Sequence, residues 1–394
     1  MKVVSIIACI ILILTTFISC ITMSANMTII RSPQVFTIKP PVAGNYPQGL
    51  YKYPYKPGTP ENELFTQTLE WSPEISKTFA VNTGYTATLT LNPVDKKHTF
   101  QGMSLSDVIG LPSVNVENIS VEAKDRSLVI KVDFEPTAEV KAAPQIIFSD
   151  DFSNTTLDNT KWELCPEYDR QGRSSWRNDM VSVSNGYLHI KFMRDQALGR
   201  SKTNNKALAD NWIRGGGIRT INKDNYQIFE NGYGYYEAKI KFPAVSGTWG
   251  AFWLMSRTQW ITSDEGIDGT EIDIVETINN HEGKYNAALH WNGYGSHHKS
   301  AGSGGAALPV NIYDGNFHIF ALDWSPSEYV FYADGKEFWR SDGSAKFNNS
   351  GINQNPNYIK LTVEGSAWVG MLPENFTEDE MLVDYVRVYN QPRN

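Results

Sequence analysis

Three carboxylates lie close together in the stretch GTEIDIVET at residues 269–277, namely Glu271, Asp273 and Glu276. The isoleucines and the valine between them favour an extended strand. Two carboxyl groups held about 5 to 5.5 Å apart can hydrolyse a glycosidic bond with retention of the anomeric configuration. One ionised carboxylate attacks the anomeric carbon, while the other protonates the leaving oxygen and then activates water. The stretch has the residue types for this chemistry, provided that one face of the strand carries them all.

The spacing of the acids decides whether they share a face. Side chains alternate along a strand, so Glu271 and Asp273 point the same way. A regular strand would turn Glu276 toward the apolar side, where an unpaired carboxylate is very costly. One extra residue in a β-bulge near Ile274–Val275 restores the alternation. The sequence thus predicts a bulged strand whose acids face one groove, whereas a solvated acidic edge strand is the alternative.

The elements that must position these acids are short strands. From about residue 145 onward, stretches such as GYYEAKIKF and FHIFALDW alternate apolar and polar residues, and no long helical pattern occurs. Hydrophobic residues make up 41% of the chain and aromatic residues 12%, which is enough for a sizeable core. We therefore expect an all-β fold in which two sheets form a large sandwich. The net charge of −8 comes without a basic stripe, which argues against nucleic acid as a partner.

The N-terminal stretch at residues 1–20 resembles an export signal, with one lysine before an apolar run. A permanent membrane anchor is the alternative, but the run is short for a span of about 20 residues. Cys20 follows the letters FIS, which resembles a bacterial lipoprotein cleavage site and predicts a lipid anchor. We expect the protein to be secreted, or anchored at the cell surface or outer membrane. Cys165 would then have no cysteine partner for a disulfide, and we expect it to be buried.

Two further segments precede the main body. Residues 21–62 are rich in proline, tyrosine and small polar residues, which predicts a flexible linker. Residues 63–141 contain alternating strand patterns separated by turn residues, which predicts a small β-sandwich. This segment resembles the immunoglobulin-like modules of bacterial surface proteins. We interpret it as a spacer with Trp71 in its core, and a carbohydrate-binding module is the alternative.

Four stretches of the main body, in this order, resemble glycoside hydrolase family 16: GYYEAKIKFPAVSGTWGAFWLM, GTEIDIVET, ALHWNGYG and LVDYVRVYN. The resemblance covers residues 145–390 and implies a catalytic domain at 145–392. That family includes laminarinases, lichenases, agarases and carrageenases. Its fold is a concanavalin-like β-jelly-roll sandwich, so the resemblance implies the same architecture here.

The resemblance implies a role for each acid. Glu271 matches the nucleophile, Asp273 its helper and Glu276 the acid/base. The bulged spacing is that of the laminarinase-like, agarase-like and carrageenase-like members, while typical lichenases carry the unbulged form. Mixed-linkage activity stays open. A like-charged neighbour raises the pKa of a carboxyl group, which would keep the acid/base protonated near its working pH.

The resemblance also implies substrate-binding residues around the acids. A flat indole can stack on the apolar face of a pyranose ring. The matching or neighbouring candidates are Trp249, Trp253, His290, Trp368, Glu364, Arg219 and Trp176, with Arg173 and Asn178 in a nearby loop. Core tryptophans, a structural histidine and a surface carboxylate are the alternatives at these positions. Asp384 matches a usual ligand of a structural calcium ion, which would take no part in catalysis. We expect no cofactor for the reaction.

These observations favour an exported, monomeric, endo-acting glycanase that retains the anomeric configuration. The expected substrate is a β-1,3-glucan or a mixed β-1,3/1,4-glucan. Endo-hydrolysis of an algal galactan (agarose, porphyran or carrageenan) is the first alternative, because arginines occur within 170–177 and 214–219. A non-catalytic surface protein that binds carbohydrate is the second. The sequence does not fix the linkage, the number of subsites, or the balance between hydrolysis and transglycosylation.

Overall fold

A computed structural model describes residues 27–31, 33, 38–48, 64–108, 110, 118–170, 172–224, 227–262, 265–279, 283–304 and 309–393. These residues fold as two compact units. The export signal expected at 1–20, including Cys20, lies outside the described residues, as does most of the linker expected at 21–62. In the part of the chain that is described, no helix is long and apolar enough to cross a membrane.

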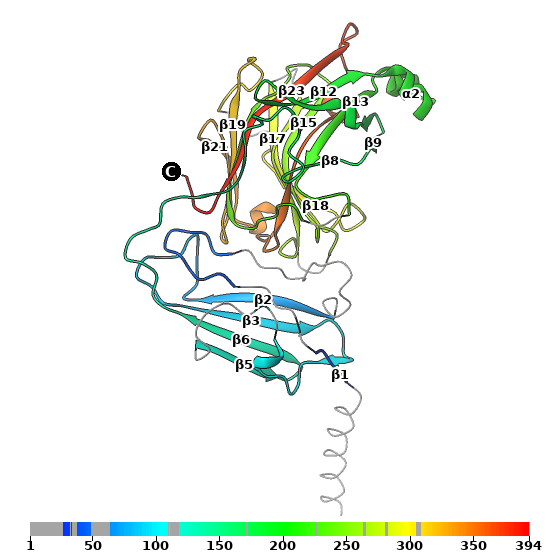
Figure 1. Cartoon of the computed structure of the whole chain (residues 1–394). Coiled ribbons are helices and arrows are strands. Elements are labelled where there is room, and N and C mark those ends of the chain that lie inside the picture. The colour runs from blue at the N-terminus through cyan, green and yellow to red at the C-terminus, as the bar shows by residue number, and fades with distance from the viewer. Residues whose placement is uncertain are drawn as a thin grey trace, which may run out of the picture. The chain divides into compact units, whose positions relative to one another are not determined.

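The smaller unit contains an antiparallel four-stranded sheet, drawn in blue to green in Figure 1. Its order is β2 (Phe65–Ser72), β3 (Tyr85–Pro93), β6 (Ser127–Phe134) and β5 (Ile119–Lys124). Two short parallel strands, β1 (Thr28–Ile29) and β4 (His98–Thr99), and the 3₁₀ turn η2 (Leu105–Asp107) accompany it. Leu89 and Ile130 are fully buried, whereas threonines alternate with leucines along β3. Trp71 packs against Tyr85 and Phe134. The immunoglobulin-like character of this unit stays a prediction.

The larger unit is built from two sheets, and we call the one that carries the acids the cleft sheet. Its strands, in order, are β8 (Glu163–Leu164), β13 (Ile213–Arg219), β22 (Asn357–Glu364), β15 (Trp249–Ser256), β16 (Thr270–Asn279), β17 (Lys284–Trp291) and β18 (Lys299–Gly302). The all-β jelly-roll architecture expected from the sequence is confirmed.

The second sheet contains the remaining strands of this unit. They are β9 (Tyr168–Arg170), β10 (Ser174–Trp176), β12 (Tyr187–Arg194), β23 (Glu378–Tyr389), β14 (Gly234–Lys241), β19 (His318–Trp324), β20 (Tyr329–Ala333) and β21 (Lys336–Ser341), with β11 (Val181–Ser184) on β12 and β7 (Ile146–Asp150) on β23. Strand β13 pairs in both sheets. Hydrogen bonding therefore continues from one sheet into the other.

Alternation along each strand decides what faces the core. On β22, Ile359 and Leu361 are fully buried in the core between the sheets, and the residues that alternate with them, Lys360 and Thr362 among them, face the cleft. The predicted turn in ADGKEF joins β20 to β21, where Asp334 and Gly335 adopt φ values of 48° and 72°. Both positive angles suit a tight hairpin between twisted strands.

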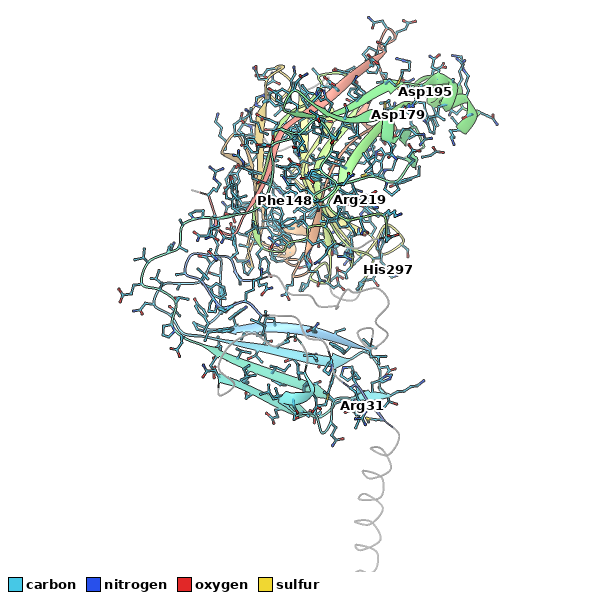
Figure 2. The ribbon with its side chains drawn as sticks, in the orientation of Figure 1. Arg31, Phe148, Asp179, Asp195, Arg219 and His297 are labelled. Carbon is cyan, nitrogen blue, oxygen red and sulfur yellow. The ribbon has the colours of Figure 1, made fainter. Side chains whose placement is uncertain are left out.

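Short helices interrupt the strand pattern at one corner of the larger unit. α2 (Gln196–Lys202) and α3 (Lys206–Asp210) begin where Asp195 and Asn205 accept hydrogen bonds from backbone N–H groups. Asp195 and Asp179 mark this corner in Figure 2, and both pair with Arg214. Three 3₁₀ turns complete the unit: η4 (Asn178–Met180), η6 (Ala345–Phe347) and η7 (Ala367–Val369). The helices are too short to give a helical pattern in the sequence, and we did not expect them.

Residues 41–48 and 75–83 belong to the larger unit, although the sequence placed them in the linker and the small module. The Tyr46 hydroxyl donates a 2.8 Å hydrogen bond to the Asp323 carboxylate. Lys77 forms a 2.7 Å ion pair with the other oxygen of Asp323. Because Asp323 is buried, these two segments supply the partners that its charge needs.

Candidate active site

Strand β16 contains the expected β-bulge. Phe252 and Trp253 are adjacent on β15, but their partners on β16 are Val275 and Asp273. Ile274 is therefore the extra residue, and the pairing with β17 shifts at the same place. Ile274 and Val275 are both fully buried in the core. Because two successive side chains point into the core, the next one, Glu276, points into the cleft, as the three-residue spacing predicted.

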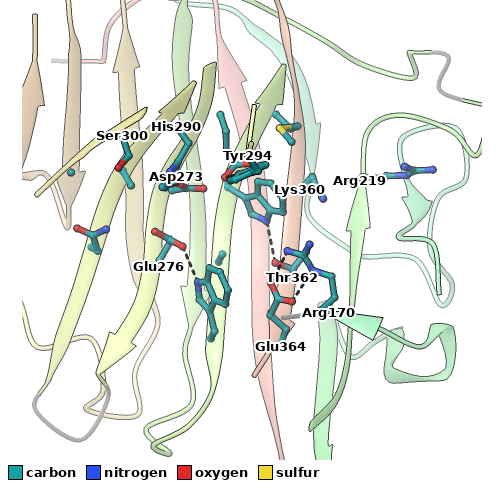
Figure 3. Close-up of a pocket in the computed structure, with 18 of the residues that line it drawn as sticks. Arg170, Arg219, Asp273, Glu276, His290, Tyr294, Ser300, Lys360, Thr362 and Glu364 are labelled. Carbon is teal, nitrogen blue, oxygen red and sulfur yellow. Dashed lines mark hydrogen bonds and ion pairs between the residues drawn. The ribbon is translucent and has the colours of Figure 1, made fainter. Parts of the chain in front are cut away.

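All three acids line one cleft of about 900 Å³ above the cleft sheet. Glu271, Asp273 and Glu276 retain only 7%, 3% and 6% of their exposure. Figure 3 shows Asp273 and Glu276 on β16, with Lys360 on β22, which is separated from β16 by β15. The acids thus lie buried on one strand that is paired on both sides, and the alternative of a solvated acidic edge is wrong.

Burial and crowding favour protonated acids. Burial, together with the charges of Glu276 and Glu271, holds the pKa of Asp273 well above its usual range. Burial raises the pKa of Glu276 to about 7, although a 2.8 Å hydrogen bond from Trp249 Nε1 opposes the rise. Burial also raises the pKa of Glu271, but the Tyr294 hydroxyl and the Lys360 ammonium favour its charged form. Glu276 can therefore hold a proton near neutral pH, while Glu271 has the support that an ionised nucleophile needs.

His290 faces Asp273 from β17. Its Nε2 lies 3.4 Å from Asp273 Oδ2, and its Nδ1 lies 3.0 Å from His298 Nε2. Burial lowers the pKa of His290 to about 4, so the imidazole is neutral at higher pH. Because the imidazole is neutral, its contact with Asp273 is not a strong ion pair, whether or not Asp273 is ionised.

The tryptophans expected in the cleft are there. Besides bonding Glu276, Trp249 meets Trp368 edge-on, with ring centres 4.9 Å apart. Trp253 Nε1 donates a 3.0 Å hydrogen bond to Thr362. Trp368 is half exposed, so its face is open to solvent. Whether these rings stack on sugars stays a prediction.

The cations of the cleft gather on the side formed by β22, β13 and β9. Arg170 forms two hydrogen bonds of 2.8 and 3.0 Å with Glu364, and its guanidinium lies 4.5 Å from the Trp176 ring centre. Glu364 is thus a buried, paired carboxylate of the cleft and not a surface one. Lys360 places its ammonium 3.8 Å from the ring centre of Trp253, and Arg219 also lines the cleft.

Two loop candidates lie outside the cleft. Arg173 is fully buried and donates hydrogen bonds to the backbone oxygens of Gly370 and Gly247. It holds loops together and is not part of the cleft lining. Asn178 begins the turn η4, where its backbone N–H bonds Glu167.

The role of Asp384 as a ligand of a structural calcium ion stays a prediction. Asp384 Oδ2 accepts a 2.6 Å hydrogen bond from Lys239, which neutralises the charge. Among the described residues, the group of acids and histidines close enough to hold a metal ion is Glu271, Asp273 and His290, in the cleft itself. We assign no calcium-dependent step to Asp384.

Several cleft residues escaped the sequence interpretation. Tyr294 lies on the loop after β17, and its hydroxyl donates a hydrogen bond to Glu271. Trp260 pairs edge-on with Tyr294, with ring centres 5.6 Å apart. Lys360 lies between Ile359 and Leu361 in NYIKLTVE, and the alternation of side chains along the strand could have revealed that it faces the cleft. A tyrosine in the glycine-containing stretch WNGYG gives no such signal, because loop geometry sets its direction.

Comparison with known proteins agrees with this geometry. The model of the beta-porphyranase A–D GH16 domain matches residues 144–391. Glucan endo-1,3-beta-glucosidase A1 of Niallia circulans is 25% identical over 283 residues, which are 65% of this chain and 39% of that protein. A beta-glucanase of Rhodothermus marinus is 26% identical over 62% of this chain and 85% of its own length. Beta-porphyranase E of Zobellia galactanivorans is 26% identical over 61% of this chain and 85% of its own length.

Solved structures share the fold. One determined in work on endo-acting O-glycanases of the human gut microbiota has a TM-score of 0.50 and 20% identity, covering 64% of this chain and 92% of its own. At that identity the likeness concerns the fold alone. The chain thus spans 39% of the first glucanase relative but most of the other two. The region that the family model matches lies within the larger unit.

Proposed function

Because this chain belongs to glycoside hydrolase family 16, we propose that it is an endo-acting enzyme that cleaves β-1,3-glucans or mixed β-1,3/1,4-glucans with retention of configuration. The observation that carries the proposal is the bulged strand, which turns Glu271, Asp273 and Glu276 into one tryptophan-lined cleft. Relatives named as an endo-1,3-beta-glucosidase and a beta-glucanase support the β-glucan substrate.

The reaction proceeds in two displacements. In the first, a Glu271 carboxylate oxygen attacks the anomeric carbon while the Glu276 carboxyl protonates the departing glycosidic oxygen, which leaves a glycosyl ester on Glu271. In the second, the Glu276 carboxylate takes a proton from water, the water oxygen attacks the anomeric carbon, and the ester bond breaks. The pKa of about 7 for Glu276 suits a group that must first donate and then accept a proton.

Asp273 serves the nucleophile. Its raised pKa favours the protonated form, which can donate a hydrogen bond to the neighbouring Glu271 carboxylate. Neutral His290 lies on its other side, with Nε2 3.4 Å from Oδ2. A protonated Asp273 also avoids a third negative charge in the cleft.

Product analysis tests the proposal. The purified protein is incubated with laminarin and with barley mixed-linkage glucan, the oligosaccharides are separated by size over time, and ¹H NMR follows the first anomer formed. We expect medium-length products early, in the β configuration. E271Q and E276Q are the matched controls, and each should lower turnover on the order of a thousandfold or more. Release of single glucose units only, or of the α anomer, would rule the proposal out.

A second candidate substrate is a galactan that carries sulfate groups. The matching family model and one relative bear the name beta-porphyranase. The cleft adds a specific observation: Lys360, Arg170 and Arg219 all lie on one side of the acids. Glu364 neutralises Arg170, whereas the Lys360 ammonium lies 4.8 Å and 3.8 Å from the ring centres of Trp176 and Trp253. Burial lowers the pKa of Lys360 to about 8, so it is mainly charged at neutral pH and could pair with a sulfate.

The two substrates are separated by running agarose, porphyran and κ-carrageenan beside the glucans. Products from a galactan alone would replace the β-glucan by the second candidate. The variant K360M then shows what the cation recognises. For a sulfated chain it should raise KM strongly, whereas for a neutral glucan it should change KM little, because no anion is bound.

Export and surface anchoring through Cys20 are a proposal from the sequence alone. Metabolic labelling with a radioactive fatty acid tests it. The label should enter the full chain and be lost in C20S. Equal labelling of both would remove the anchor.

A further inference from the structure

The loop that follows β17 places a phenol directly over the nucleophile. The Tyr294 hydroxyl donates a hydrogen bond to Glu271 Oε1. Asn292 and Gly293, with φ values of 63° and 68°, turn the chain just before the tyrosine. Among the described residues, no other hydrogen bond to the Glu271 carboxylate is found. One oxygen is therefore held, while the other is left for the anomeric carbon.

We propose that Tyr294 is a positioning residue of this hydrolase, whose hydroxyl orients the Glu271 carboxylate and favours its ionised form. The inference rests on the proposed function, because it assigns a task within that reaction. A hydrogen bond donated to a charged carboxylate stabilises the charge more than the neutral acid. Without it, burial would push Glu271 further toward the protonated and unreactive form.

The surroundings of Tyr294 fix the position of its hydroxyl. The ring lies 5.1 Å from that of His298 and 5.6 Å from that of Trp260, measured between ring centres. His298 in turn stacks on His290 at 5.2 Å and bonds it at 3.0 Å. The loop is thus tied to β17 and to the loop that carries Trp260. A donor held in this way loses little freedom when the substrate binds.

Other charged and titratable groups also face Glu271, and they stay in place when the tyrosine hydroxyl is removed. These groups are Asp273 and Glu276 on β16, His290 on β17, His298 on the loop, Lys360 and Glu364 on β22, and Arg170 on β9. Lys360 and Arg170 favour the ionised nucleophile, while Glu364 disfavours it. A change in the ionisation of Glu271 in a Tyr294 variant can therefore be ascribed to the lost hydroxyl.

The test replaces Tyr294 by phenylalanine, which keeps the ring and removes the donor. The nucleophile must be ionised, so a higher Glu271 pKa moves the acidic limb of the kcat/KM profile to higher pH. We expect a shift of about one pH unit and a loss of roughly 10- to 100-fold in kcat at the optimum. The basic limb, which reports Glu276, should stay where it is. The matched control is Y313F, which removes a hydroxyl bonded to the Lys284 carbonyl away from the cleft.

The outcomes separate positioning from mere packing. A Y294F enzyme with an unmoved acidic limb, whether equally active or uniformly slower, would overturn the proposal. If the native enzyme cleaves none of the polysaccharides, the proposed function fails, but Tyr294 can still be judged. ¹³C NMR titration of labelled glutamate then compares the Glu271 pKa in the native protein and in Y294F. An equal pKa contradicts the proposal, and a higher pKa in Y294F supports it.

Discussion

The two glutamates of the cleft differ in the side chains that donate hydrogen bonds to them. Glu276 receives an N–H from Trp249, while Glu271 receives an O–H from Tyr294 and faces Lys360. Burial raises the pKa of both acids, so these few partners set how far each rises. The division into proton donor and nucleophile therefore depends on side chains from other strands and loops.

The Trp249 hydrogen bond should be visible in the pH dependence. W249F removes the N–H that lowers the pKa of Glu276, so this pKa should rise from about 7. Since the first step needs protonated Glu276, the basic limb of kcat/KM should move to higher pH by several tenths of a unit to about one unit. W253F is the control, because that indole bonds Thr362. An unmoved basic limb in W249F would remove this role.

The raised pKa of Glu276 also has a cost in stability. Its folded value of about 7 exceeds the ordinary 4.5, so the stability that the protonated group contributes is present below pH 4.5 and lost as the pH rises through 7. E276Q cannot ionise. We expect it to be more stable than the native protein at pH 8, on the order of 2 kcal/mol, and about equal at pH 4. Urea unfolding at both values measures this, and a difference that does not vary with pH would contradict it.

The bulge in β16 turns all three acids of the sequence motif toward the cleft. The period of two along a strand was enough to predict the bulge, since Glu276 could not lie in the core. The same rule would have found Lys360 between Ile359 and Leu361. It could not find Tyr294, because a loop residue has no fixed period and its contact with Glu271 spans 23 positions.

Deletion of single residues tests the bulge. Without Ile274 the strand is regular, and all three acids still alternate toward the cleft. Without Ile272, the flanking acids become neighbours and one of them must enter the core. We expect the Ile274 deletion to fold and keep measurable activity, with stability lowered by about 2–4 kcal/mol for the lost core side chain. The Ile272 deletion should not fold, as judged by circular dichroism. If both deletion variants fold, or neither does, the alternation of side chains between cleft and core does not determine whether this strand forms.

At the scale of the whole molecule, the larger unit includes segments that precede its first strand in the sequence. The family resemblance begins near residue 145 and so gave no sign of residues 41–48 or 75–83. Part of their attachment is one buried carboxylate, Asp323, which Tyr46 and Lys77 bond from different parts of the chain, and the Tyr46 backbone N–H also donates to the Asn390 carbonyl. Such long-range pairs leave no local pattern, which is why the boundaries could not be predicted.

The variant Y46F measures this attachment. Removing the hydroxyl leaves the Asp323 carboxylate with one partner fewer in a buried place, which should cost about 1–3 kcal/mol of the unfolding free energy. K77M should cost less, about 1 kcal/mol, because the lysine side chain is 39% exposed. Urea unfolding followed by near-ultraviolet circular dichroism compares them. No loss in Y46F would mean that the Tyr46 hydroxyl contributes nothing to the stability of the larger unit.

The most direct test of the account is to trap the glycosyl ester on the enzyme. A 2-fluoro glycoside with a good leaving group, built on the sugar unit that the enzyme cleaves, slows the second displacement more than the first. Mass spectrometry of the intact protein and of its peptides then locates the sugar. We expect one adduct per chain, on Glu271, that is absent in E271Q. An adduct on another residue, or inversion of configuration with no adduct at all, would contradict this expectation.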